Sequence, residues 1–221
     1  ELGGNAPFIV FDDADIEQAI SGLVAAKLRN SGQVCISPNR IYVQAGIHDR
    51  FVQRLTEAVE RIRVDQGLQP DFVVGPLINQ AALDKVSRLV EQAQKSGAKT
   101  LLGGRRHDNG GLFYAPTILT NVADDMDICS TELFGPVFPV YTFASEKEVI
   151  ARANATEYGL VAYAFTRDLG RAFRLSRDIE AGMVILNSGS VGTASVPFGG
   201  VKQSGYGREG GYYGIEEYVQ V

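Results

Sequence analysis

The chain has 221 residues, a formal net charge of −5, a hydrophobic content of 45% and two cysteines. This composition is typical of a globular domain, and the scattered lysines and arginines exclude the basic footprint of a nucleic-acid-binding protein. No apolar run approaches the roughly 18 residues of a membrane span, and two distant cysteines make no disulfide framework, so we expect no membrane partner and a cytoplasmic location, with organelle import left open.

Hydrophobic periodicity predicts alternating strands and helices along the chain. A strand at 7–11, a helix at 16–28 with aspartates as N-cap candidates, and a strand at 40–44 make a βαβ unit. Further strands are expected at 100–102, 137–143, 160–166 and 183–187, and further helices at 51–62, 79–97, 146–154, 171–179 and between 210 and 218. The order predicts an α/β fold with a mostly parallel sheet flanked by helices.

In proteins with parallel sheets, catalytic and ligand-binding residues usually lie on loops beyond the carboxyl ends of the strands. The loops of unusual composition are 30–38, 132–136, 187–197 and 198–208. These loops are therefore the candidates for the functional site.

Cys35 lies in a short polar segment with a glycine, between a predicted helix and a predicted strand. A thiolate attacks carbonyl carbon well, and the backbone N–H of such a loop can help to hold an oxyanion. From the loop alone, an inert structural cysteine is an equal alternative, and Cys129 fits that structural interpretation. Glu1 offers a carboxylate that can activate water, although a terminal glutamate in isolation is more often simply solvated.

Four motifs together resemble the aldehyde dehydrogenase superfamily. They are Glu1-Leu2-Gly3-Gly4, Gly32-Gln33-Val34-Cys35, Glu132-Leu133-Phe134-Gly135-Pro136, and Pro197 to Gly205 followed by Gly207-Arg208-Glu209. They occur in the order found in that family and extend over nearly the whole chain. Any one of them alone is a weak signal, and the combination is a strong one.

The resemblance implies a two-stage oxidation of a small-molecule aldehyde. Cys35 forms a thiohemiacetal, hydride passes to NAD or NADP, and Glu1 activates the water that hydrolyses the resulting thioester. It also implies that Glu132 binds the nicotinamide ribose, that Phe134 packs near the nicotinamide, and that Asn187 helps to organise the site. The residue chemistry agrees, because a carboxylate accepts hydrogen bonds from ribose hydroxyls and an aromatic face suits the ring. No metal site is expected.

Within the superfamily the chain is most similar to succinate-semialdehyde dehydrogenases, in segments 28–33, 39–44 and 207–218. Arg29 matches an arginine that binds the substrate carboxylate there, a task that suits a guanidinium fork. Ser37 stands where many of these enzymes have a second cysteine, so a redox pair is not available. A carboxylate-binding serine is replaced by glycine at position 192, and Thr193 or Ser190 are the candidate substitutes. The alternatives are another semialdehyde or a general aliphatic or aromatic aldehyde.

We expect residues 1–221 to form the catalytic domain, with 206–221 as a helical tail of the same unit. The resemblance places a coenzyme domain upstream and an oligomerisation strand downstream of this stretch, so the cofactor is bound mainly elsewhere and residues 1–221 alone are expected to be inactive. The full-length protein is expected to be a homodimer or homotetramer. A CoA-acylating relative lacks the glutamate base, and a non-catalytic relative with a structural or binding role would not need Cys35, so Glu1 and Cys35 argue against these two alternatives.

Overall fold

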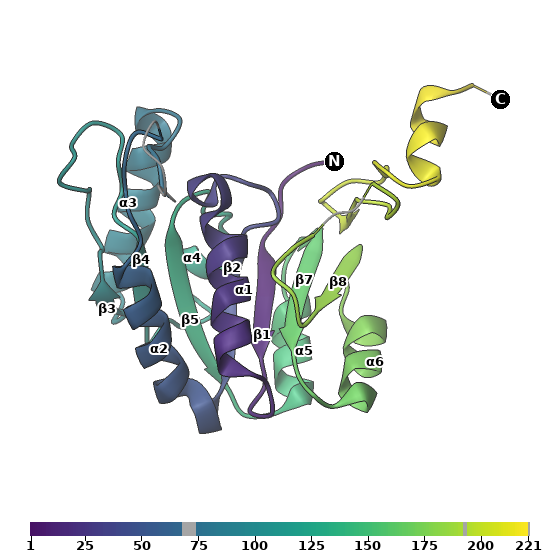
Figure 1. Ribbon diagram of the computed structural model, residues 1–221, viewed down its shortest axis with the longest axis horizontal. Coiled ribbons are helices and arrows are strands. Elements are labelled where there is room, and N and C mark those ends of the chain that lie inside the picture. The colour runs from purple at the N-terminus through teal and green to yellow at the C-terminus, as the bar shows by residue number, and fades with distance from the viewer. Residues whose placement is uncertain (68–73, 192–193, 221) are drawn as a thin grey trace.

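The computed structural model describes residues 1–67, 74–191 and 194–220. Its centre is a seven-stranded sheet of order β3-β4-β5-β2-β1-β7-β8 (Figure 1). The strands are β1 (Ala6–Val10), β2 (Pro38–Gln44), β3 (Lys99–Leu102), β4 (Thr117–Thr120), β5 (Val137–Phe143), β7 (Val161–Phe165) and β8 (Met183–Leu186). Neighbouring strands are parallel apart from β3 and β4, which are antiparallel. The expected α/β fold with a mostly parallel sheet is confirmed.

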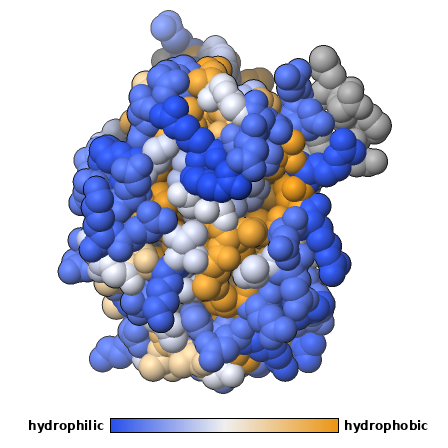
Figure 2. Space-filling model, turned by 90° about the vertical axis from the view of Figure 1, so that its left-hand side faces the viewer, coloured by the Kyte–Doolittle hydropathy of each residue, from blue (hydrophilic) through white to orange (hydrophobic). Residues whose placement is uncertain are grey.

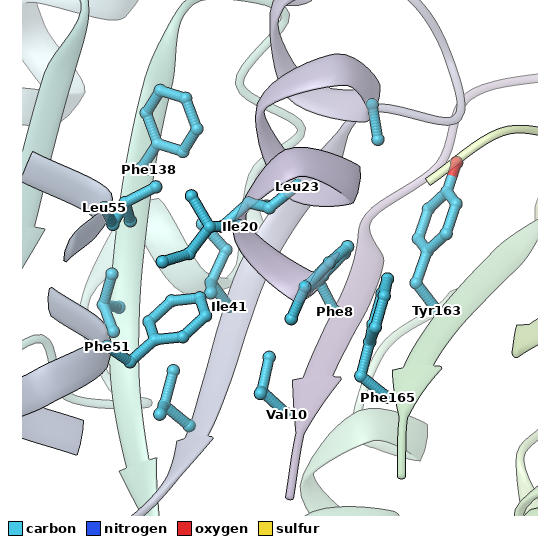
Figure 3. Packing of buried hydrophobic residues seen from close by; sticks show 14 of the residues in the cluster. Phe8, Val10, Ile20, Leu23, Ile41, Phe51, Leu55, Phe138, Tyr163 and Phe165 are labelled. Carbon is cyan, nitrogen blue, oxygen red and sulfur yellow. The ribbon is translucent and has the colours of Figure 1, made fainter. Parts of the chain in front are cut away.

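Two-residue alternation along the strands divides the core into two layers. Phe8 and Val10 of β1 belong to one hydrophobic cluster, and Ile9 belongs to the other. Helices α1 (Ile16–Leu28) and α2 (His48–Glu60) cover the first face and stand in front of the sheet in Figure 1. Figure 3 shows how Ile20 and Leu23 of α1 point into this first cluster. The second face is covered by α3 (Gln80–Lys95), α4 (Asp127–Ser130), α5 (Glu146–Asn154) and α6 (Leu169–Asp178).

Side-chain caps fix where most of the longer helices begin. Asp15, Asn79, Ser145 and Asp168 each accept a hydrogen bond from the backbone N–H three residues later. This satisfies a donor that has no partner within the helix. The expected helices and strands outside the tail are confirmed, with ends that differ by no more than a few residues.

Some elements of the structure were not anticipated. β4 and α4 are only four residues long, too short to show a hydrophobic period. β6 (Tyr158–Gly159) and β9 (Val201–Lys202) form a separate antiparallel pair. The helix expected between 210 and 218 is a 3-10 helix, η3 (Tyr213–Tyr218), near the C-terminus in Figure 1.

The surface beside β3 is mostly hydrophilic, with apolar side chains showing through its middle (Figure 2). A hollow near this edge is lined in part by Ile62, Val64 and Leu102. None of the described helices is both long enough and apolar enough to cross a membrane.

Three of the candidate segments lie at the amino edge of the sheet. Glu1 to Asn5 precede β1, Cys35 precedes β2, and Glu132 precedes β5. The expectation that loops 30–38 and 132–136 follow the carboxyl ends of strands was therefore wrong, whereas Asn187 does follow the carboxyl end of β8. The strand order β5-β2-β1 places the three segments side by side, at the upper edge of the sheet in Figure 1.

Candidate active site

Gly3 and Gly4 allow the three segments to converge. A Cβ built on Gly3 would lie 3.0 Å from Oε2 of Glu132, and one built on Gly4 would lie 2.5 Å from the carbonyl oxygen of Cys35. The N–H of Gly4 donates a 2.9 Å hydrogen bond to Oε1 of Glu132. Because both glycines lack a side chain, the backbone after Glu1 fits between the cysteine loop and the glutamate loop.

The Cys35 thiol is half-buried and has the Glu1 carboxylate as its main charged neighbour. Burial raises the pKa of Cys35 to about 11, and the nearby carboxylates of Glu1 and Glu132 act in the same direction. The thiol is therefore neutral near pH 7 in this arrangement. Glu1, at an exposed position, is the group near the thiol that can accept its proton.

The loop that carries Cys35 begins with an unusual backbone. Asn30 and Ser31 adopt left-handed conformations with φ of 49° and 60°, and Gly32 follows with φ of 79°. The hydroxyl of the buried Ser31 donates to the carbonyl oxygen of Gly75 at 3.1 Å. The N–H of Gly75 donates to the Ser31 hydroxyl oxygen at 2.8 Å. Non-glycine residues keep a left-handed backbone where surrounding contacts stabilise it. The hydrogen bonds with Gly75 therefore fix the start of the loop.

Gln33 joins the same loop to the segment after Gly75. Its side-chain oxygen accepts from the N–H of Ile78 at 2.8 Å, and its amide donates to the carbonyl of Pro76 at 3.3 Å. This supporting segment was not anticipated, because nothing in its composition marks it as a partner of Cys35.

Tyr163 contacts the end of the cysteine loop and has Arg29 among its electrostatic neighbours. The buried Tyr163 hydroxyl donates to the carbonyl of Ile36 at 3.0 Å, and its electrostatic neighbours include Cys35 and Arg29. Burial and the negative charge of a Cys35 thiolate raise the pKa of Tyr163, and Arg29 opposes the shift. The Arg29 guanidinium is exposed and makes no hydrogen bond or ion pair among the residues that the structure describes. It is thus available to bind an anion.

Glu132 and Phe134 lie on the loop before β5. Glu132 is half-buried, and burial raises the pKa of its carboxyl above the usual value, while Gly4 N–H and two lysines oppose the shift. Phe134 is partly buried and has a left-handed backbone, with φ of 55°. A carboxylate fixed by one backbone N–H, beside an aromatic side chain and within electrostatic reach of the thiol, fits the ribose and nicotinamide of a dinucleotide.

Ser204 holds the segment after Glu1. This buried hydroxyl donates to the carbonyl of Gly3 at 2.7 Å and accepts from the N–H of Gly159 at 3.0 Å. The N–H of Leu2 donates to the carbonyl of Ser204 at 2.9 Å. The glycine-rich closing motif therefore positions Glu1, which its sequence alone did not indicate.

Three predicted residues are not joined to Cys35 by the described contacts. Asn187 follows β8 at the carboxyl edge and exchanges hydrogen bonds of 2.9 and 3.0 Å with the backbone of Thr166, so its site-organising role stays a prediction. Ser190 is exposed, and its N–H donates to the Ser188 hydroxyl at 3.1 Å. Thr193 lies outside the described residues. Cys129 is buried in α4, in agreement with the structural interpretation.

Comparison with known proteins agrees with this geometry. The aldehyde dehydrogenase family matches residues 1–221. The chain is 48% identical over its whole length to the 3-sulfolactaldehyde dehydrogenase of Pseudomonas putida and 47% identical to the NADP(+) succinate-semialdehyde dehydrogenase of Escherichia coli K12. It spans 46% of each of these relatives, just under half their length.

Among solved structures, an Escherichia coli protein described as an NADP-dependent enzyme matches the whole chain with a TM-score of 0.98 and 47% identity, and the chain covers 46% of it. The fold is thus shared with this protein. The family match extends over the entire chain, from Glu1 through Cys35 and Glu132 to the closing glycine-rich motif. The chain belongs to the aldehyde dehydrogenase family.

Proposed function

We propose that the full-length protein oxidises an aldehyde that carries an anionic group, with succinate semialdehyde as the first candidate, to the carboxylic acid, using NAD or NADP. The proximity of the Glu1 carboxylate to the Cys35 thiol carries this proposal. It joins a nucleophile to a base, and Gly4 connects the same segment to a carboxylate suited to a cofactor ribose.

The reaction begins with proton transfer from Cys35 to Glu1. The thiolate attacks the aldehyde carbon, a C–S bond forms, and the carbonyl electron pair moves onto oxygen to give a thiohemiacetal. A nicotinamide cofactor, when bound, would supply the acceptor for the hydride from that carbon, and Cys35 would then carry a thioester. Glu132 and Phe134 hold the ribose and ring in this proposal.

Glu1 acts a second time, after its first proton has passed to solvent. It takes a proton from water as the water attacks the thioester, and the C–S bond then breaks to release the acid and the Cys35 thiolate. The exposed position of Glu1 supports this step, because water can reach it.

The substrate class rests on Arg29 and on the names of the relatives. Sulfolactaldehyde and succinate semialdehyde both carry an anionic group besides the aldehyde. Arg29 has no hydrogen-bond or ion-pair partner within the described part of the chain and, like Cys35, acts electrostatically on Tyr163, so in this proposal its exposed guanidinium binds such a group. The names of the relatives mention both NADP and NAD, so both cofactors stay candidates. Roles for Ser190 and Thr193, a homodimeric or homotetrameric assembly and a cytoplasmic location stay predictions.

An aldehyde panel tests this function. The full-length protein is assayed with NAD and with NADP against succinate semialdehyde, glutarate semialdehyde and butanal, beside Cys35→Ala and the matched control Cys129→Ala. We expect NAD(P)H formation that Cys35→Ala abolishes and Cys129→Ala retains. Unchanged turnover in Cys35→Ala would refute the mechanism.

A further inference from the structure

Arg40, on β2, is a buried arginine with only 1% of its surface exposed. Removing a charged group from water is unfavourable unless other groups compensate for the lost hydration. In the described part of the chain, its hydrogen-bond partners are all backbone carbonyl oxygens and none is a carboxylate. The reaction steps above make no use of Arg40, so its burial requires another explanation.

The Arg40 guanidinium joins the chain before β1 to the end of α5. Nε and Nη2 both donate to the carbonyl oxygen of Asn5, at 3.1 and 2.8 Å. Nη1 donates to the carbonyl oxygen of Arg152 at 2.9 Å, and Nη2 donates to that of Ala153 at 3.0 Å. Carbonyls in the last turn of a helix lack partners within the helix, and a cation is favoured there. Arg40 therefore ties Asn5 to the carboxyl end of α5.

Lys202, on β9, is a second cation at the same end of α5. Its ammonium donates to the carbonyl oxygens of Asn154 and Thr156, at 3.0 and 3.3 Å, and pairs with the carboxylate of Glu180. The backbone of Lys202 is left-handed, with φ of 55°, a conformation that surrounding contacts must stabilise. Two cations from distant parts of the chain thus bind neighbouring carbonyls at one helix end.

Lys202 is linked to the first residues of the chain. Ser204, two residues after it, donates to the carbonyl oxygen of Gly3 at 2.7 Å. Glu1 itself packs on Gly205, where an added Cβ would lie 3.5 Å from the Cα of Glu1. The start of the chain therefore rests on the strand turn that Lys202 holds.

Arg40 holds the other end of the same segment, residues 1–5. Asn5 directly follows Gly4, and a Cβ built on Gly4 would lie 2.5 Å from the carbonyl oxygen of Cys35. The segment is therefore held near both of its ends while its backbone lies directly against the cysteine loop.

We propose that Arg40 and Lys202 are positioning residues, which anchor segment 1–5 to the carboxyl end of α5 and thereby keep Glu1 next to Cys35. A guanidinium fork can bind Asn5 and two helix carbonyls at once, whereas a lysine ammonium is a single point of contact, so the shape of Arg40 matters besides its charge. The consequence for catalysis rests on the function proposed above. The anchoring itself does not.

Iodoacetamide alkylation of the full-length protein, without cofactor or substrate, tests the anchoring. Lys202→Met and Arg40→Lys are compared with the wild type at pH 8. We expect Cys35 to react about threefold to tenfold faster in both variants, because a displaced Glu1 no longer raises the pKa of the thiol. The matched control is Lys147→Met, which removes an exposed lysine from the first turn of α5 and should leave the rate unchanged.

The same two substitutions in a Glu1→Gln background separate positioning from a general loss of structure. Without the Glu1 carboxylate, neither substitution should accelerate Cys35 further, because the group that they displace is already gone. Cys129 is buried outside segment 1–5, so its alkylation should be no faster than in the wild type. Should Arg40→Lys fail to fold, Lys202→Met decides, since the Lys202 side chain is 26% exposed and its loss is better tolerated.

An unchanged Cys35 rate in either folded variant overturns the anchoring role of that residue. Equal acceleration with and without the Glu1 carboxylate overturns the inference, and so does faster alkylation of Cys129 together with Cys35, because opening of the fold would then explain the result. The expected alkylation pattern in a full-length protein that forms no NADH or NADPH with any aldehyde overturns the proposed function and supports the anchoring. The two failures are therefore distinguishable.

Discussion

The hydroxyl of Ser204 donates a hydrogen bond of 2.7 Å to the carbonyl oxygen of Gly3, two residues after Glu1. This contact joins the end of the chain to its beginning and fixes the backbone from which Glu1 extends toward Cys35. The proposed nucleophile and base therefore depend on a residue that touches neither of them.

Ser204→Ala is expected to lower the free energy of unfolding by about 1–3 kcal/mol, because two buried backbone groups lose their partner. Urea denaturation measures this loss. Ser176→Ala, which removes a hydroxyl from the exposed surface of α6, should change stability by less than about 0.5 kcal/mol. Thioester hydrolysis should slow more than the first turnover in Ser204→Ala, and equal slowing of both steps would contradict a role in positioning Glu1.

Gly4→Ala is expected to displace the cysteine loop. The added Cβ would lie 2.5 Å from the backbone oxygen of Cys35, which cannot move without moving the loop. Such overpacking typically costs about 1–3 kcal/mol, and chemical denaturation measures it. Gly46→Ala is the matched control, because a Cβ added there would have no described atom within 4 Å beyond its chain neighbours. Equal stability of the two variants would show that Gly4 does not approach Cys35 this closely in solution.

Glu1→Gln is expected to make Cys35 more reactive toward iodoacetamide. An ionised Glu1 raises the pKa of Cys35, so its removal lowers that pKa from about 11 and increases the thiolate fraction at pH 8. A shift of about one unit gives a roughly tenfold faster alkylation. Peptide mass spectrometry separates Cys35 from Cys129, which serves as an internal reference.

The control for this experiment is Glu17→Gln, which removes an exposed carboxylate paired with Arg54. Its Cys35 alkylation rate should equal that of the wild type. Steady-state turnover by Glu1→Gln should fall in spite of the more reactive thiol, since the base for thioester hydrolysis is gone. An unchanged alkylation profile from pH 7 to pH 11 would place Glu1 away from the thiol in solution.

Arg29→Leu is expected to discriminate between substrates. For succinate semialdehyde, kcat/KM should fall by about tenfold to a hundredfold, the value of a charge-assisted hydrogen bond, whereas butanal should be oxidised as before. Arg88→Leu, on the exposed face of α3, should affect neither substrate. If kcat/KM fell equally for both aldehydes, Arg29 would stabilise the loop and would not bind the substrate.

The sequence by itself determined the α/β order of elements and the motifs around Glu1, Cys35 and Glu132. Hydrophobic periodicity and motif spacing are local properties, so they can be determined from the sequence without knowledge of the fold. β4 was not expected, whereas β3 and β8, also four residues long, were, because so short a segment holds too little periodicity for consistent prediction. The helix of the tail was expected, but its 3-10 geometry was not.

Only the tertiary structure decided which edge of the sheet carries the site and which residues support it. Strand order is set by packing between distant segments, and the order β5-β2-β1 brings the three motifs to the amino edge. Lys27 follows an unremarkable alanine pair in the sequence, yet the Glu132 loop, far along the chain, covers its surroundings. Burial of this kind arises from contacts across the fold, which no local pattern records.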